Sequence, residues 1–198
     1  MPAKRYRGDE TWNRLLFWSD AQKASERLAG HILAAEGYKS IDPSHPLGGR
    51  DGLKDITCKK DSVSWIAACY FPNGQKSFKD IQEKFLHDAT AIPKKKNSGF
   101  IFLTNQYLKI SEREKLAKST QLKNTVIFHL EMVVHILNKP ENYGIRLEFL
   151  DIEMNREEQI AFFADWSKKY FQDLEDFRQT IMGDIKSTIQ EALPKQRR

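Results

Sequence analysis

The sequence predicts an α/β domain with a mixed central sheet flanked by helices, followed by a long C-terminal helix. Two strand-like segments separated by a short turn indicate an antiparallel hairpin, and strand and helix patterns alternate after it. An apolar stripe with helical spacing then runs almost to the C-terminus. We place an N-terminal helical arm at 1–18, the α/β domain at 19–153 and a C-terminal amphipathic helix at 154–198.

The composition is that of an ordinary globular protein. The 198 residues are 40% hydrophobic and 30% charged, which is enough for one sizeable core. Apolar runs stay well short of the roughly 18 residues that cross a bilayer, and the N-terminus shows no signal-peptide pattern. Cys58 and Cys69 are too few for a disulfide framework, so we expect a cytoplasmic protein. The net charge of +5 permits an acidic partner such as nucleic acid without requiring one.

The first elements are expected to be helical. A short helix is predicted around Trp12, and Ser19 with Gln22 forms a capping-box pattern that opens a second helix. Gly37 ends that helix. Residues 40–52 are dense in Pro, Gly, Ser and Asp, so we expect a loop there.

Two strands, at 53–59 and 64–71, should form the hairpin. The second is almost entirely apolar, which indicates a central strand covered on both faces.

The rest of the domain alternates between helices and strands. Ser or Asn followed three residues later by an acidic residue marks three helix starts. These are Ser77 with Asp80, Ser111 with Glu114, and Asn155 with Glu158. We expect strands at 99–103, 126–128 and 146–152, and a further helix at 131–137. The alternation is typical of βαβ units with parallel strands.

The last helix is unusually long and carries a continuous apolar stripe. Its members are Phe163, Trp166, Tyr170, Leu174, Phe177, Ile181, Ile185 and Ile189. In one interpretation the helix packs along its own domain. In the other it binds a partner helix or a second copy of the chain, so that the protein forms a homo-oligomer.

The segment Gly48-Gly49-Arg50-Asp51-Gly52-Leu53-Lys54-Asp55-Ile56 carries a family resemblance. It resembles the GGxDGGxDI element of Mrr-type PD-(D/E)xK restriction-endonuclease-like domains. A preceding helix with Glu26 and a strand end reading Thr104-Asn105-Gln106 are also similar to that family. The resemblance covers roughly residues 19–153 and implies a restriction-endonuclease-like central sheet.

This resemblance implies a metal-dependent DNA endonuclease that acts in bacterial restriction or anti-phage defence. Asp55 and Glu26 would be the metal ligands and, with a lysine, the catalytic residues. Phosphodiester cleavage in such a site uses magnesium or manganese, and a nearby lysine positions or deprotonates the attacking water. The expected substrate is double-stranded DNA.

The sequence departs from the family on the following strand. The expected Glu/Gln-x-Lys is replaced by Ala68-Cys69-Tyr70. In one interpretation the lysine has moved to Lys76 or Lys79 at the start of the next helix, or to Lys59 on the hairpin. In the other, catalysis is lost and the fold is retained as a module that binds a partner or nucleic acid.

Basic residues that are candidates for phosphate contacts lie in loops and at the C-terminus. They are Arg50, Lys94, Lys95, Lys96, Arg197 and Arg198. Such contacts hold the DNA backbone without reading its sequence. A solvated basic loop is the alternative interpretation of the three lysines.

Overall fold

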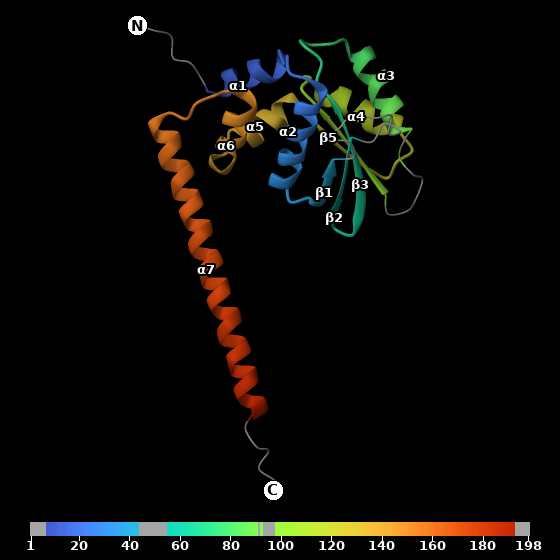
Figure 1. Ribbon diagram of the computed structural model, residues 1–198. Coiled ribbons are helices and arrows are strands. Elements are labelled where there is room, and N and C mark those ends of the chain that lie inside the picture. The colour runs from blue at the N-terminus through green and yellow to red at the C-terminus, as the bar shows by residue number, and fades with distance from the viewer. Residues whose placement is uncertain (1–6, 44–54, 91, 93–97, 193–198) are drawn as a thin grey trace. The chain divides into compact units, whose positions relative to one another are not determined.

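The computed structural model describes residues 7–43, 55–90, 92 and 98–192 (Figure 1). The chain divides into two compact units, Met1–Glu153 and Met154–Arg198. The first unit holds the sheet with its flanking helices, and the second holds the long helix α7 (Arg156–Ala192). The predicted long C-terminal helix is therefore confirmed.

Within the described residues, five strands form one sheet in the order β1-β2-β3-β4-β5. They are β1 (Lys39–Pro43), β2 (Ile56–Lys60), β3 (Val63–Tyr70), β4 (Ser98–Thr104) and β5 (Asn124–Phe128). β1, β2 and β3 pair antiparallel, whereas β3, β4 and β5 pair parallel. The predicted mixed sheet is confirmed, and so is the β2–β3 hairpin. Its turn residues Asp61 and Ser62 have positive φ angles of 50° and 63°, as tight hairpin turns require.

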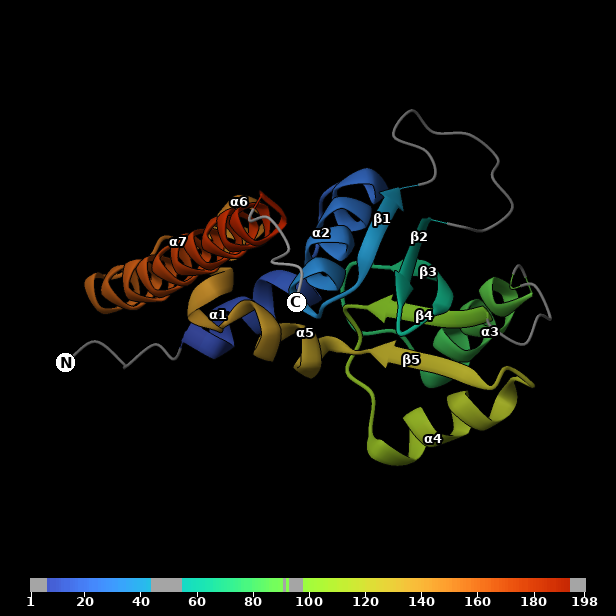
Figure 2. The same cartoon turned by 90° about the horizontal axis from the view of Figure 1, so that it is seen from below.

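Helices cover both faces of the sheet (Figure 2). One face carries α1 (Arg7–Leu16), α2 (Gln22–Ala35), α5 (Leu130–Leu137) and α6 (Tyr143–Leu150), and the other carries α3 (Phe78–Ala89) and α4 (Ile110–Ser119). A short 3-10 helix, η1 (Pro140–Asn142), precedes α6. Because side chains alternate along a strand, β4 sends Ile101 and Leu103 into one apolar cluster and Phe100 and Phe102 into the other.

Two predicted helix starts are confirmed by their caps. The Ser77 hydroxyl accepts a hydrogen bond from the Asp80 N–H at 3.2 Å and so caps α3. Asn155 and Glu158 cap the start of α7 reciprocally: each backbone N–H donates to the other side chain, at 3.0 and 2.8 Å. Such a capping box satisfies two backbone donors that the helix itself leaves unpaired.

The other two predicted caps are wrong. The second helix starts after Ala21 and has no side-chain cap, so Ser19 does not fill that role. Ser111 lies inside the first turn of α4, where the Lys109 N–H donates to the Glu112 carboxylate at 2.8 Å.

The predicted strand at 146–152 is instead the helix α6. Its buried residues Arg146 and Leu150 are four positions apart, which is the spacing of one helix face. The Arg146 guanidinium also lies 4.4 Å from the centre of the Tyr143 ring, one turn earlier. Polar and apolar residues alternate from Arg146 to Phe149, and this short alternation imitates a strand.

The predicted loop at 40–52 begins with part of an edge strand, β1. Its pairing with β2 shifts register between Lys39 and Asp42, and Ser40 has a positive φ of 51°. Such a bulge and a proline, here Pro43, are both tolerated at a sheet edge because one side of the strand needs no partner.

The N-terminal helix α1 belongs to the first compact unit and lies against α5. The Trp12 indole N–H donates to Glu131 at 2.9 Å, and the Thr11 hydroxyl donates to Asn138 at 2.8 Å. A separate role for residues 1–18 as an arm stays a prediction.

In the described part of the chain, no helix combines the length and apolar character needed to cross a lipid bilayer.

Candidate active site

Asp55 lies at the end of the β2–β3 hairpin, immediately before β2. Its N–H donates to the Ala67 carbonyl at 3.2 Å, and its Oδ2 accepts from the Cys69 N–H at 2.7 Å. The N–H groups of a strand lie in the plane of the sheet. The Asp55 carboxylate, which accepts from one of them, is therefore held near that plane at the rim of the sheet. Burial raises the pKa of Asp55, and the Cys69 hydrogen bond opposes that rise.

Glu26 approaches this rim from α2. The Gln22 amide, one turn earlier on α2, donates to the Cys69 carbonyl at 3.3 Å, so α2 contacts the same residue that binds Asp55. Burial raises the pKa of Glu26, and the negative charge of Asp55 raises it further. The two carboxylates therefore lie close enough for their charges to interact.

A lysine and a third acid reach the same region from α3, on the other face of the sheet. Lys84 Nζ lies 2.6 Å from Asp88 Oδ1, and the Asp88 side chain is only 1% exposed. The positive charge of Lys84 lowers the pKa of Asp55, whereas the charge of Asp88 raises it. We call Asp55, Glu26, Lys84 and Asp88 the rim cluster.

The rim cluster suits a small hard cation that keeps part of its water shell. Among the described residues, no group of three or more His, Cys, Asp or Glu side chains is arranged to hold a metal ion. Mg²⁺, however, is usually held by one or two carboxylates, with water and substrate phosphates completing its shell. A cation between Asp55 and Glu26 would relieve their mutual repulsion, which raises the pKa of Glu26. Asp88 Oδ2 is also buried and has no hydrogen-bond partner in the described part of the chain.

Two of the three lysines singled out from the sequence, Lys59 and Lys79, lie away from the rim cluster, and a role for Lys76 stays a prediction. Lys79 is 84% exposed and lies 3.9 Å from Glu83 on the outer side of α3. Lys59 is exposed on β2, roughly 13 Å along the strand from Asp55 at about 3.3 Å per residue. Lys76 is half-buried, and its N–H donates to Gln106 at 2.6 Å.

The sequence analysis did not single out Lys84 and Asp88, although the spacing of apolar residues along α3 indicates that Asp88 lies on its buried face. Ile81 and Phe85 lie on the buried face of α3, and Asp88 follows at the next position on that face. An acid on an apolar stripe needs a partner, and Lys84 is placed one turn before it.

The Thr104-Asn105-Gln106 segment, also singled out from the sequence, is a buried structural network. All three side chains are fully buried at the end of β4. They donate to the carbonyls of Tyr70, Leu15, Pro72 and Gly74, and Gln106 accepts from the Lys76 N–H. The network holds the loop between β3 and α3, and so positions the start of the helix that carries Lys84.

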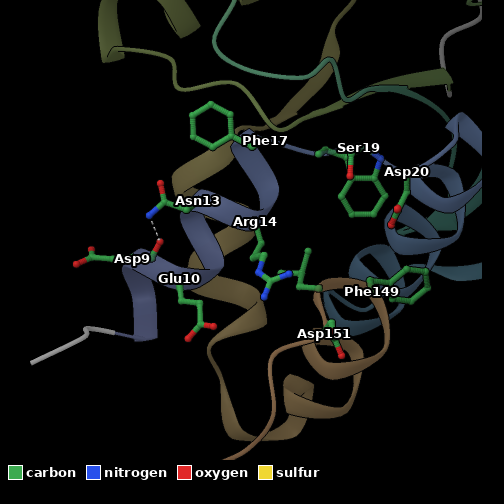
Figure 3. Close-up of a pocket in the computed structure, with 11 residues that line it drawn as sticks. Asp9, Glu10, Asn13, Arg14, Phe17, Ser19, Asp20, Phe149 and Asp151 are labelled. Carbon is green, nitrogen blue, oxygen red and sulfur yellow. Dashed lines mark hydrogen bonds between the residues drawn. The ribbon is translucent and has the colours of Figure 1, made fainter. Parts of the chain in front are cut away.

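A cavity of about 830 Å³ lies apart from the rim cluster, beside α1 and the end of α6 (Figure 3). Asp9, Glu10, Asp20 and Asp151 line it together with Arg14. This mostly acidic lining repels phosphate groups, so the cavity does not fit a nucleic acid.

The basic residues predicted to contact phosphates lie outside the described residues. They are Arg50, Lys94, Lys95, Lys96, Arg197 and Arg198.

Comparison with known proteins identifies the fold. No protein-family model and no curated protein matches the sequence. Among solved structures, the MspJI restriction endonuclease in complex with a 27-mer oligonucleotide is similar, with a TM-score of 0.50 and 16% identity. This chain has a restriction-endonuclease-like fold. The match covers 81% of this chain and 40% of the MspJI chain, so the chain spans less than half of that enzyme's length.

In this restriction-endonuclease-like fold, β3 contributes only apolar and aromatic side chains beside Asp55. Ala68 is buried in the apolar cluster under α3, and Tyr70 packs against the same cluster. The charged groups around Asp55 therefore come from the two helices that approach the sheet rim from opposite faces.

Proposed function

We propose that the chain is a metal-dependent DNA endonuclease of the Mrr-like PD-(D/E)xK type that acts in bacterial restriction or anti-phage defence. The observation that carries this proposal is the rim cluster, where two interacting carboxylates share a sheet rim with Lys84. The defence role rests on the family resemblance of the segment around Asp55. Double-stranded DNA as substrate and a cytoplasmic location stay predictions.

Each member of the cluster has a role in this proposal. Asp55 and Glu26 would hold magnesium or manganese, which would supply Lewis-acid activation of the nucleophile and offset phosphate charge. Lys84 supplies the positive charge that the missing lysine of β3 would provide, and it orients the attacking water or the scissile phosphate. Asp88 keeps Lys84 in place through their 2.6 Å ion pair.

A catalytically inactive binding module is the second candidate. It is favoured by β3, where the buried Ala68 stands in place of the expected acid or amide. In this alternative the chain binds nucleic acid or a partner through its basic residues, and the rim cluster is only structural.

Cleavage of supercoiled plasmid by the full chain separates the two candidates. The nuclease proposal predicts nicked and linear products with Mg²⁺ or Mn²⁺ and none with excess chelator. Binding of the plasmid without cleavage under every metal condition would support the inactive module.

Replacing Lys84 with Met should lower the cleavage rate roughly 100-fold, because a positioned proton-transfer or charge-stabilising group contributes about that much. DNA affinity should change little, because a single, partly buried lysine contributes little to the total phosphate contacts. Lys79→Met is the matched control, because Lys79 lies on the same helix and is 84% exposed. Equal rates for the two variants would remove Lys84 from the mechanism.

Replacing Lys94, Lys95 and Lys96 together with Ala should weaken DNA binding about equally for all sequences. The dependence of log affinity on log salt concentration should flatten by roughly 0.9 per lost phosphate contact. Fluorescence anisotropy at several salt concentrations measures that slope. An unchanged slope would identify these residues as a solvated basic loop.

A further inference from the structure

A small hollow lies beyond the carboxyl ends of the parallel strands β3 and β4. Its volume is about 200 Å³, and the loops that follow these two strands form it together with the first turns of α3 and α4. Pockets for drug-sized ligands measure roughly 300–1,000 Å³, so this hollow suits a single ring system. Its apolar wall consists of Phe78, Ile81 and Leu108. We call it the Tyr107 hollow, after the aromatic residue that also lines it.

Tyr107 has a firmly held backbone and an exposed ring. Its N–H donates to Gln75 Oε1 at 3.0 Å, and its carbonyl accepts from Gln75 Nε2 at 3.3 Å. This reciprocal pair ties the β4–α4 loop to the β3–α3 loop. The neighbouring Gln106 and Leu108 are buried, whereas Tyr107 is 44% exposed. An aromatic ring on a fixed backbone can stack on a ligand at a small cost in conformational entropy.

Two lysines and one carboxylate set the charge around this ring. Lys76 is half-buried and Lys109 is exposed, and in the described part of the chain neither ammonium group has an ion-pair partner. Glu112 is the acid among the described lining residues, and its Oε2 accepts from the Lys109 N–H at 2.8 Å. A carboxylate beside an apolar wall repels a phosphate from the hollow itself but tolerates a neutral ring. The two lysines can attract the phosphates that flank such a ring.

The Tyr107 hollow lies at the same end of the sheet as the Asp55 carboxylate. Asp55 accepts from the Cys69 N–H near the end of β3. Tyr70, the next residue, pairs with Thr104 on β4, three residues before Tyr107. β2 and β4 are two strand spacings apart, which is roughly 10 Å at about 4.8 Å per spacing. A stacked nucleic-acid strand advances about 3.4 Å per nucleotide, so roughly three nucleotides cover that distance.

We propose that the Tyr107 hollow binds one unpaired nucleobase, roughly three nucleotides from the phosphate at the rim cluster. The base stacks on Tyr107 beside the apolar wall, and Lys76 and Lys109 contact the neighbouring phosphates. A base inside an intact duplex is stacked between its neighbours and does not reach the hollow. The preferred substrate is therefore DNA with a single-stranded segment next to the cleavage site. The position of the scissile phosphate rests on the proposed nuclease function, whereas binding of the unpaired base does not.

Fluorescence anisotropy in excess chelator tests the base site without relying on cleavage. The probes are a short fluorescein-labelled single strand and the blunt duplex of the same sequence. Tyr107→Ala in the full chain should weaken single-strand binding roughly tenfold, because stacking of one base contributes about that much, and should change duplex binding less than about twofold. Tyr107→Phe keeps the ring and should bind the single strand as the unmodified chain does. Unchanged single-strand binding by Y107A, or an equal loss on both probes, would overturn the proposal.

Ile110→Ala is the matched control for the loss of exposed apolar surface. Ile110 is 68% exposed at the start of α4 and is not one of the residues that line the hollow. This variant should bind both probes as the unmodified chain does. A loss of single-strand binding as large as that of Y107A would contradict a specific stacking role for Tyr107.

Cleavage assays separate a failure of the base site from a failure of the nuclease proposal. With Mg²⁺, the unmodified chain should cut a duplex that carries a single-stranded tail faster than a blunt duplex, and Y107A should lose that preference. Asp55→Asn should slow the cutting of both substrates and leave single-strand binding in chelator unchanged. If the unmodified chain cuts neither substrate, the nuclease proposal fails and the anisotropy result alone decides the base site. A Y107A variant that still prefers the tailed duplex would exclude Tyr107 from substrate selection.

Discussion

Replacing Asp55 with Asn is expected to lower metal-dependent cleavage by roughly 10³-fold or more, which is about 4 kcal/mol of transition-state stabilisation. Asn keeps the shape of the side chain and can still accept the hydrogen bond that the Cys69 N–H donates. It removes the negative charge that would hold the cation in the proposed mechanism. Initial rates of plasmid cleavage at saturating Mg²⁺ measure the loss.

The same variant should remain folded. Burial raises the pKa of Asp55, so the folded protein favours the neutral acid and loses stability as the pH rises through that raised pKa. At neutral pH without metal, D55N should therefore unfold at no lower a temperature than the unmodified chain. Asp42→Asn, on the exposed face of edge strand β1, is the matched control and should retain full activity. Cleavage by D55N at the rate of D42N would exclude Asp55 from the site.

Replacing Phe85 with Ala should lower the free energy of unfolding by about 3–5 kcal/mol. Phe85 is fully buried on α3, and its ring lies 5.3 and 5.2 Å from the rings of Phe100 and Phe102. Truncation leaves a cavity at the centre of the apolar cluster beneath α3. Urea unfolding followed by tryptophan fluorescence should show a lower midpoint with an unchanged slope.

Leu86→Ala provides the control for this substitution. Leu86 is the next residue on α3 and is 37% exposed, so its loss should lower the free energy of unfolding by less than about 1.5 kcal/mol. If the two variants were equally stable, the apolar cluster would not be what anchors α3, and the placement of Lys84 would need another cause.

Much of the fold follows from local sequence signals. The two-residue turn between β2 and β3, the Ser77 cap of α3 and the Asn155 cap of α7 are short-range features that the sequence displays directly. The parallel strands follow because each is joined to the next by a helix. The helix α6 was not predictable in this way, since the burial of Arg146 depends on the neighbouring Asn138 and Tyr143.

The candidate site was only half predictable. The family resemblance indicates Asp55 and Glu26, whereas the lysines suggested by the sequence, Lys59, Lys76 and Lys79, extend no further than the start of α3. Lys84 comes into the cluster because α3 packs with Ile81 and Phe85 on the sheet and so turns Asp88 inward. That rotation of the helix is fixed by tertiary packing, which spacing from the β3 motif does not reveal.

Mn²⁺ binding to the full chain is the most direct test of the rim cluster. Calorimetry in the presence of a phosphorothioate duplex, which resists cleavage, measures cation affinity without relying on activity. We expect saturable binding to the unmodified chain, and binding at least about tenfold weaker for both D55N and Glu26→Gln, because each removes one proposed carboxylate ligand. Equal Mn²⁺ affinity for the unmodified chain and both variants would contradict it.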